Sequence, residues 1–578
     1  MKQIAIFLML FCTSVLLALS GTYTIGGSSA DFPTLASAIT AANTEGLSAN
    51  TEFVLNPGTY SGPFTLQHAT NGHELMITSG SAPSGSVIIN NPTATTEINY
   101  IIRIEAVSFV KLQGLRFETT GSLNRAVYIN GNADEISITS CFFQGGVGAT
   151  SNNSGAIYIT ASGSGDADNL YLALNNFQDG GYHVVVNSGS YNDFFSDWEI
   201  LNNYFADGYL GLYLMRFSNL QLQDNTLEDM NGGFDLNTGS GTLEISGNRI
   251  TNCATGITAQ YLSSNTSVPH IFNNIISSTG YYGISIYGTD LQILHNTIVN
   301  SSAESYNRHA ASIGGTGNLV KKNHFICTGG GIALTASSVD PTYPQRNIIE
   351  HNNIYSYGLN VAKISNDSYK DLELYNDVTD TANVSYNPFF SGVFLTPASS
   401  ALDNLYPSTA VTVDFNGNAR SPINSDIGAH EYTSAAGMTP MSGNYTIGTP
   451  GDFATLQEFC NAIAQRGISA AVNGQLTETD YEEQVVLHAI PNASEANFVT
   501  IISVIAGHTN LSFSGQTAST PYVMNLIRSS FVKLSNITFS TTATANSNLL
   551  LLSGYNHDLF IHYSQFDAPA NTGGISLG

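Results

Sequence analysis

A short motif, usually Gly-Φ-x-Φ, recurs along the chain, where Φ is apolar and x is variable. A period of two predicts short strands with one buried face, so the x side chains should point outward. These x residues are Tyr128, Tyr158, Tyr213, Asp235, Thr258 and Ser285. The next outward positions hold Asn130, Thr160, Met215, Asn237, Gln260 and Tyr287. Aromatic rings beside amides and hydroxyls suit sugars, which offer C–H faces and many hydroxyl groups.

This pattern favours a polysaccharide or a cell-surface glycan as the ligand of the outward face. The residues expected to bind it are Tyr128, Tyr158, Tyr213, Asp235, Gln260 and Tyr287. A plain solvated sheet face explains the same residues, because Tyr and Thr are common in strands for reasons of packing alone. The sequence leaves both interpretations open.

Catalysis on such a face would need specific groups. Glycosidases use a pair of carboxylates, and lyases that act on uronates need a base and a means of neutralising the sugar carboxyl group. The outward positions offer one carboxylate, Asp235, and one nearby base candidate, Arg216. These are weak catalytic candidates, since an Asp and an Arg on neighbouring turns also form ordinary surface ion pairs.

Acidic residues recur four positions after a repeated Asn, at Asp179, Asp207 and Asp229. Oxygen ligands on successive turns of chain could bind Ca²⁺. Alternatively, these residues cap turns, as Asp often does before Gly. A third set, His295, Lys322 and His351, precedes three of the repeated Asn residues. It could form a basic stripe for uronates or consist of exposed turn residues.

A second pattern indicates the strands and turns that position these side chains. It is a repeated Asn that is preceded by alternating apolar residues and followed by any residue and then an apolar one. It occurs at Asn175, Asn203, Asn225, Asn248, Asn274, Asn296, Asn323 and Asn352, at intervals of 22 to 29 residues. One unit cannot bury its apolar side alone, but stacked units can. Stacking would align the Asn side chains at one bend, where an amide satisfies backbone groups. We expect this role to be structural.

The composition restricts the partners. Only 10% of residues are charged and the formal net charge is −26, with 17 Lys and Arg in 578 residues. Nucleic acid is therefore an unsuitable partner, because phosphate binding needs clustered basic residues. Since 42% of residues are hydrophobic, the chain can still bury a long core.

Three segments resemble the right-handed parallel β-helix proteins of the pectin- and pectate-lyase-like superfamily. Asp31 to Ile39 resembles the helix that caps the first coil, Val54 to Tyr60 resembles the opening strand and turn, and Asp426 to Tyr432 resembles the closing segment. The resemblance implies an all-β solenoid with substrate along the outward face of one sheet. It implies either an extracellular polysaccharide lyase or hydrolase, or a non-catalytic surface protein that binds glycans; missing catalytic pairs favour the second.

The domain organisation follows from an internal duplication. Tyr23, Asp31 and Ser108 begin short motifs that recur at Tyr445, Asp452 and Ser530, with offsets of 422, 421 and 422 residues. We expect a signal peptide at residues 1–20, a β-helix at 21–432, a linker at 433–442 and the truncated start of a second β-helix at 443–578. The leader has Lys2 followed by a short apolar run, which predicts secretion and no membrane span after cleavage. We also expect a monomer.

Overall fold

The computed structural model describes residues 18–67, 70–119, 125–145, 155–160, 167–187, 194–264, 268, 270–303, 307–435, 437–545, 547–569 and 573–577. The chain divides into two units, Met1–Glu199 and Ile200–Gly578. Within the described residues the helices are α1 (Leu35–Glu45), α2 (Leu372–Thr379) and α3 (Leu456–Arg466), and strands dominate the rest. No helix in this described part is both long and apolar enough to cross a membrane.

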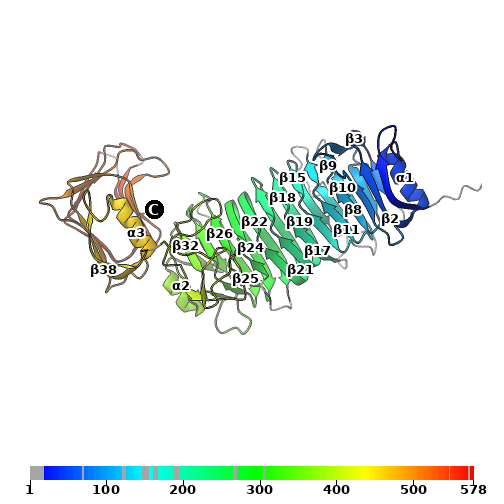
Figure 1. Cartoon of the computed structure of the whole chain (residues 1–578). Coiled ribbons are helices and arrows are strands. Elements are labelled where there is room, and N and C mark those ends of the chain that lie inside the picture. The colour runs from blue at the N-terminus through cyan, green and yellow to red at the C-terminus, as the bar shows by residue number, and fades with distance from the viewer. Residues whose placement is uncertain are drawn as a thin grey trace, which may run out of the picture. The chain divides into compact units, whose positions relative to one another are not determined.

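The first unit is a stack of coils whose strands pair in parallel with those of the next coil (Figure 1). One face contains β1 (Leu19–Ile25), β2 (Leu47–Leu55), β5 (Leu75–Thr78), β8 (Val110–Gln113), β11 (Ile136–Thr139) and β14 (Leu170–Ala173). A second contains β3 (Gly58–Ser61), β6 (Val87–Asn90), β9 (Arg116–Glu118), β12 (Phe142–Gln144) and β15 (Asn176–Gln178). A third contains β4 (Phe64–Leu66), β7 (Tyr100–Glu105), β10 (Arg125–Asn130), β13 (Gly155–Thr160) and β16 (Tyr182–Asn187).

The interior of this unit consists of stacked equivalent side chains. The rings of Phe117 and Phe143 are stacked with centroids 5.0 Å apart, and Phe143 and Phe177 follow at 4.6 Å. Helix α1 buries its apolar residues Leu35, Ala38, Ile39 and Ala42, and Thr34 caps its first turn. The predicted capping helix is therefore present. Strand β1 begins at the buried Leu19, whereas residues 1–17 of the predicted signal peptide lie outside the described residues.

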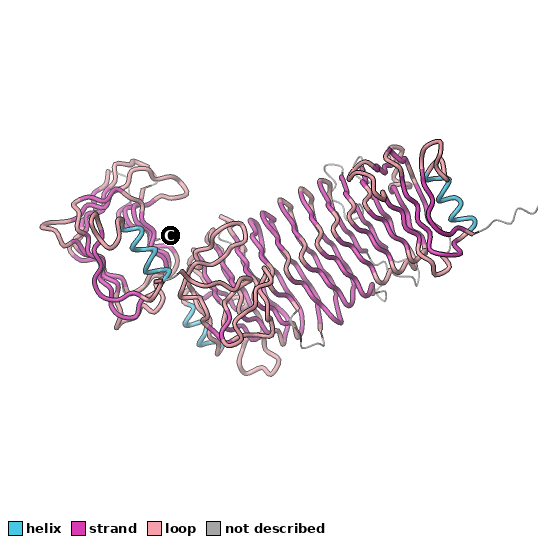
Figure 2. The backbone as a smooth tube through the Cα atoms, viewed as in Figure 1, coloured by secondary structure: helices cyan, strands magenta, loops and turns pink. Residues whose placement is uncertain are grey.

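The second unit continues the same coil pattern, with strands and turns alternating along the chain (Figure 2). Its first strands are β18 (Tyr204–Ala206), β19 (Leu210–Gln223), β20 (Thr226–Glu228), β21 (Gly232–Ser246), β22 (Arg249–Ser263), β23 (Ile271–Phe272), β24 (Ile275–Thr289), β25 (Gln292–Leu294) and β26 (Thr297–Asn300). The next are β27 (His309–Thr316), β28 (Leu319–Lys321), β29 (His324–Cys327), β30 (Ile332–Ala336), β31 (Ile348–Glu350), β32 (Asn353–Ser356), β33 (Ala362–Ile364) and β34 (Asp367–Tyr369). Strand β17 (Phe195–Leu201) spans the boundary between the units.

A column of buried Asn side chains runs through the second unit. The Nδ2 group of Asn203 donates to Oδ1 of Asn225 at 3.0 Å, that of Asn225 to Asn248 at 3.0 Å, and that of Asn248 to Asn274 at 2.9 Å. The same amides donate to the main chain, as Asn248 does to the Leu222 carbonyl oxygen at 2.8 Å. The predicted structural Asn column is confirmed. It extends one residue further, to Asn383 in the segment after α2.

A closing segment, defined here as residues 404–432, follows these coils and contains β35 (Tyr406–Pro407) and β36 (Asn424–Ser425). The second sequence copy then folds as the first one does. In the second copy, the backbone amide of Thr446 donates to Asp452 at 2.7 Å. The equivalent bond in the first copy runs from the backbone amide of Thr24 to Asp31, at 2.8 Å.

The second copy has three parallel sheets. They are built from β37 (Met441–Ile447), β38 (Ile468–Leu476), β39 (Asp480–Glu482), β40 (Val485–His488), β41 (Val499–Ser503), β42 (Thr509–Ser512), β43 (Tyr522–Ile527), β44 (Val532–Ser535), β45 (Ile537–Ser540), β46 (Asn548–Ser553), β47 (Leu559–His562), β48 (Gln565–Asp567) and β49 (Gly573–Leu577).

Candidate functional site

The predicted outward residues lie in register. In the first unit, Tyr128 of β10 pairs with Tyr158 of β13, and Asn130 pairs with Thr160. In the second unit, two columns pass through β19, β21, β22 and β24. One consists of Tyr213, Asp235, Thr258 and Ser285, and the other of Met215, Asn237, Gln260 and Tyr287. The strand repeat therefore places these side chains in rows on one sheet face of each unit.

In the first unit this face carries two arginines among three tyrosines. The guanidinium carbon of Arg125 lies 3.6 Å from the ring centroid of Tyr158 and 4.7 Å from that of Tyr128. The guanidinium carbon of Arg103 lies 5.4 Å from the Tyr128 centroid and 6.0 Å from that of Tyr100. These are cation–π distances. We call Tyr100, Arg103, Arg125, Tyr128 and Tyr158 the arginine–tyrosine ladder.

Polar groups surround the ladder. Arg103 forms an ion pair with Glu105, 2.7 Å between Nη2 and Oε1, and Gln67 donates to the other oxygen of Glu105 at 3.2 Å. The Tyr128 hydroxyl lies 3.4 Å from the Thr160 hydroxyl. Burial lowers the pKa of Arg125, but a guanidinium stays charged in proteins. Among the described residues named here, two cations and one carboxylate leave a formal charge of one positive unit.

The sequence pattern singled out Tyr128 and Tyr158 but missed both arginines. Tyr158 was expected to point outward, yet it is almost fully buried. Arg103 pairs directly with Tyr128, so extending the Tyr128 column by one coil would have found it. Arg125 lies two residues before the buried Val127, so strict alternation along the strand would place the Arg125 side chain in the interior of the coil. The structure leaves Arg125 half-buried beside the rings, because the alternation breaks at the start of β10.

The face of the second unit is less charged. Tyr213 donates to the sulfur of Met215 at 3.1 Å. Burial raises the pKa of Asp235, and burial together with Asp235 raises the pKa of Tyr213. Tyr287 is exposed, and its ring lies edge-on to that of Tyr261 with centroids 5.8 Å apart. The exposed Gln260 precedes Tyr261.

The weak catalytic candidates lie on different parts of this face. Asp235 is half-buried opposite Tyr213. Arg216 occupies a left-handed backbone conformation with φ of 56°, three residues after Tyr213. Within the described part of the chain, the side chains of Asp235 and Arg216 form no ion pair with each other. The geometry provides no pair of carboxylates that could flank a glycosidic bond at these positions.

The acidic column lies at turns. Asp179, Asp207 and Asp229 all have φ between 55° and 57°, the left-handed region that Asp tolerates in tight turns. Asn252 donates to Oδ1 of Asp229 at 3.2 Å. Among the described residues no three His, Cys, Asp or Glu side chains gather as metal ligands. The calcium ladder stays a prediction, and calcium that changes neither melting temperature nor bound-metal content would contradict it.

The expected exposure of His295 and Lys322 is wrong, because the closing segment covers both. The ring of His295 contacts the Thr409 hydroxyl at 2.9 Å, and Lys322 donates to the carbonyl oxygens of Tyr406, at 2.6 Å, and Ser425. His351 stacks on Tyr406 with centroids 4.3 Å apart. The basic stripe therefore anchors the closing segment and cannot bind uronates in this structure.

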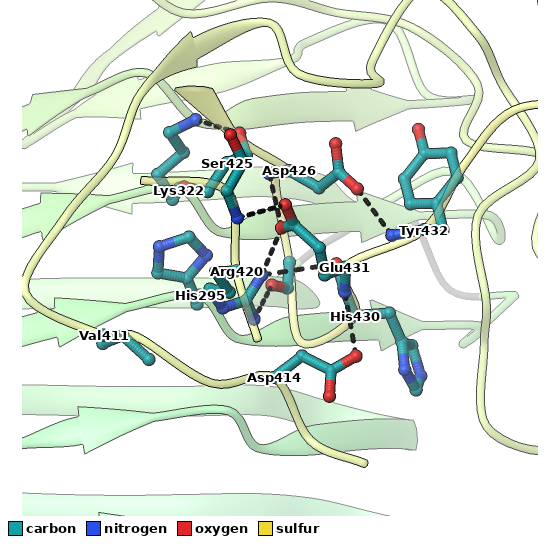
Figure 3. Close-up of polar contacts among 12 residues, drawn as sticks. His295, Lys322, Val411, Asp414, Arg420, Ser425, Asp426, His430, Glu431 and Tyr432 are labelled. Carbon is teal, nitrogen blue, oxygen red and sulfur yellow. Dashed lines mark hydrogen bonds and ion pairs between the residues drawn. The ribbon is translucent and has the colours of Figure 1, made fainter. Parts of the chain in front are cut away.

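Further buried charges complete this anchor (Figure 3). Arg420 donates to Oδ1 of Asn273 at 2.9 Å and pairs with Glu431 at 3.3 Å. Asp426 accepts the backbone amides of Asn404 and Tyr432, both at 2.6 Å. Burial lowers the pKa of Lys322 to about 7 and raises that of Asp426 to about 7. Asp426 and Glu431 lie in the stretch from Asp426 to Tyr432 that resembles a closing segment, and both accept backbone amides there, which gives them a structural role.

Comparisons with known proteins concern the fold. Residues 100–269 match the family model described as a right-handed β-helix region, and no curated protein matches. Among solved structures, the alginate lyase AlyGC of family PL6 shares 11% identity over 96% of this chain and 78% of its own, with a TM-score of 0.33. Tailspike protein 3 of bacteriophage CBA120 shares 13% identity over 63% of this chain and 57% of its own, with a TM-score of 0.30.

The match to the family model, the parallel coils and the buried Asn column agree on the architecture. The chain folds as an all-β parallel solenoid, and its residues 100–269 match the family model of the right-handed β-helix.

Proposed function

We propose that this chain is a secreted or cell-surface protein that binds an acidic polysaccharide along the outward sheet face, with the arginine–tyrosine ladder as its main contact. The observation that carries the proposal is the position of Arg125 over Tyr158 and Tyr128, with Arg103 on the other side of Tyr128. Cations and rings thus alternate across three successive coils.

The chemistry of the ladder matches a uronate polymer. Tyrosine rings present apolar faces for sugar C–H groups and hydroxyls for their polar edges. A guanidinium fork can bind a carboxylate through two parallel hydrogen bonds. Neighbouring strands are about 4.8 Å apart, so a polymer that crosses the coils meets a similar set of groups at each one.

The charge of the whole molecule makes this local arrangement informative. A chain with a formal net charge of −26 repels polyanions over most of its surface. The ladder contains two arginines, and the adjacent Glu105 is paired with one of them, Arg103. Binding of a polyanion therefore needs a positive site of this kind, whereas a neutral glycan would not need the arginines.

The second sequence copy provides an internal contrast. Its strand β43 corresponds to β7 at an offset of 422 residues, and β46 corresponds to β10 at an offset of 423. The positions of Arg103 and Tyr128 are occupied there by Asn525 and Leu551. We therefore assign glycan binding to the first copy.

Affinity electrophoresis with polygalacturonate, and with its fully methyl-esterified form, tests the proposal. We expect the wild type to be retarded by the acidic polymer only, and Arg125→Gln and Tyr128→Ala to weaken binding at least tenfold. Tyr171→Ala is the matched control, since Tyr171 is 38% exposed on β14, in a different face. The proposal fails if both ladder variants bind like the wild type or if esterification makes no difference.

A further inference from the structure

We propose that a pocket on the last coils of the second unit binds a single carboxylate-bearing sugar unit, the end of a chain, with Lys363 as its counter-charge. The choice of ligand class rests on the proposed function above, but the site is separate from the arginine–tyrosine ladder and can be tested without it. No residue of this pocket was singled out by the sequence pattern.

The pocket has a volume of about 260 Å³ and includes Asn307, His309, Leu359, Asn360, Lys363 and Ser368 in its lining. Lys363 continues the outward column of the second unit, because it pairs with Thr335, which pairs with Ser312 and then with Ser285. The pocket therefore lies on the face that carries Tyr213 and Asp235.

The parallel sheet stops at this point. Strand β33 is followed by β34, which returns antiparallel to it, with Lys363 opposite Ser368. Both residues line the pocket. A ligand that follows the outward column meets this hairpin instead of another open coil, so the geometry favours the end of a sugar chain over its middle.

Lys363 supplies a positive charge that the surrounding residues do not neutralise. Within the described part of the chain, Lys363 takes part in no ion pair and no side-chain hydrogen bond. The lining contains no carboxylate. In a protein with a formal net charge of −26, a half-buried ammonium group in a hollow without acidic residues is a selective site for an anion.

His309 adds a fixed, neutral hydrogen-bonding group. Its Nδ1 atom lies 3.0 Å from the Thr335 hydroxyl, and its ring stacks on Tyr282 at 5.5 Å with an interplanar angle of 18°. Burial and the Lys363 charge lower the pKa of His309 to about 4. The imidazole is therefore neutral at physiological pH, and only Lys363 carries charge in the pocket.

The size and remaining lining of the pocket fit one sugar ring. Pockets for drug-sized ligands span about 300–1,000 Å³, so a volume of about 260 Å³ suits a smaller group. Asn307, Asn360 and Ser368 offer amide and hydroxyl partners for sugar hydroxyls, and Leu359 and Ile332 offer apolar surface for C–H groups.

Titration calorimetry and NMR with galacturonate, and with galactose as its neutral counterpart, test the inference on the whole chain. We expect galacturonate to bind and to shift the His309 ring signals, and galactose to bind at least tenfold more weakly. Lys363→Gln should lower the galacturonate affinity at least tenfold. Lys321→Gln is the matched control, since Lys321 pairs with Glu350 on another face at 2.5 Å.

The outcomes separate the two proposals. If Lys363→Gln binds galacturonate as the wild type does, or if galactose binds equally well, the pocket assignment is overturned, whatever the polymer does. If polygalacturonate binding is insensitive to Arg125→Gln while galacturonate binding depends on Lys363, the ladder proposal fails and the pocket stands. Circular dichroism of Lys363→Gln confirms that a loss of binding is not a loss of fold.

Discussion

The guanidinium carbon of Arg125, on β10, lies 3.6 Å from the ring centroid of Tyr158, on the paired strand β13 of the next coil. The tyrosine is almost fully buried under this arginine and its neighbours, with 4% of its surface exposed. Tyr158 thus supports Arg125, and Tyr128, which is half-buried, is the more accessible ring. A ligand on this face would meet a positioned guanidinium group beside an accessible aromatic ring.

The first prediction concerns the shape of this cation. Arg125→Lys keeps the charge but loses the planar fork that can bind a carboxylate through two hydrogen bonds and stack on a ring. We expect the variant to bind polygalacturonate about 2- to 30-fold more weakly than the wild type, since 1.4 kcal/mol is tenfold and a cation–π contact contributes about 0.5–2 kcal/mol.

Binding isotherms at two salt concentrations check this prediction. Arg125→Lys should keep the salt dependence of the wild type, whereas Arg125→Gln should reduce it, because only the second variant removes a charge. Equal affinity of wild type and Arg125→Lys would show that charge alone matters at this position.

The second prediction concerns the Asn column. Asn248 accepts the backbone amide and the Nδ2 group of Asn225, both at 3.0 Å, and donates to the carbonyl oxygen of Leu222 at 2.8 Å. Asn248→Ala would remove all three of these buried hydrogen bonds, at a cost of about 1–3 kcal/mol for each group left unsatisfied. We therefore expect the free energy of unfolding to fall by at least about 2 kcal/mol.

Urea unfolding followed by circular dichroism measures this loss. Gln260→Ala is the control, because Gln260 is exposed on the neighbouring strand β22 and its removal should change stability by less than about 0.5 kcal/mol. Equal midpoints for Asn248→Ala and Gln260→Ala would contradict the structural role of the column.

Much of this architecture could be predicted because each coil repeats one local rule. The Asn spacing and the alternation around Tyr213 specify which residues face inward and which share a register, and the pairs Tyr213–Asp235 and Asp235–Thr258 follow from that rule. The capping helix at Leu35 was equally predictable, since its apolar residues recur with helical spacing.

The site residues that were missed depend on contacts the repeat does not encode. Arg125 breaks the alternation at the start of its strand, and Lys363 becomes a pocket residue only because β34 returns antiparallel. Lys322 was expected at an exposed turn, yet residues 84 and 103 positions away cover its ammonium group. A local pattern contains no information on such long-range packing.

The third prediction concerns the pH dependence of the closing segment. Burial lowers the pKa of Lys322 to about 7 in the folded chain, whereas an unfolded lysine has a pKa of about 10.4. Between these values the unfolded chain binds more protons, so this group makes stability rise with pH from about 7 to about 10. Burial raises the pKa of Asp426 to about 7, so this group makes stability fall between about pH 4 and pH 7.

The two contributions can be separated by variants. The difference in melting temperature between wild type and Lys322→Met should change with pH above about 7 and stay constant below it. The difference between wild type and Asp426→Asn should change between about pH 4 and pH 7 only. Lys321→Met is the control for loss of a half-exposed lysine that is already paired with Glu350. If Lys322→Met and Lys321→Met follow the same pH profile, the buried ammonium group does not control the stability of the closing segment.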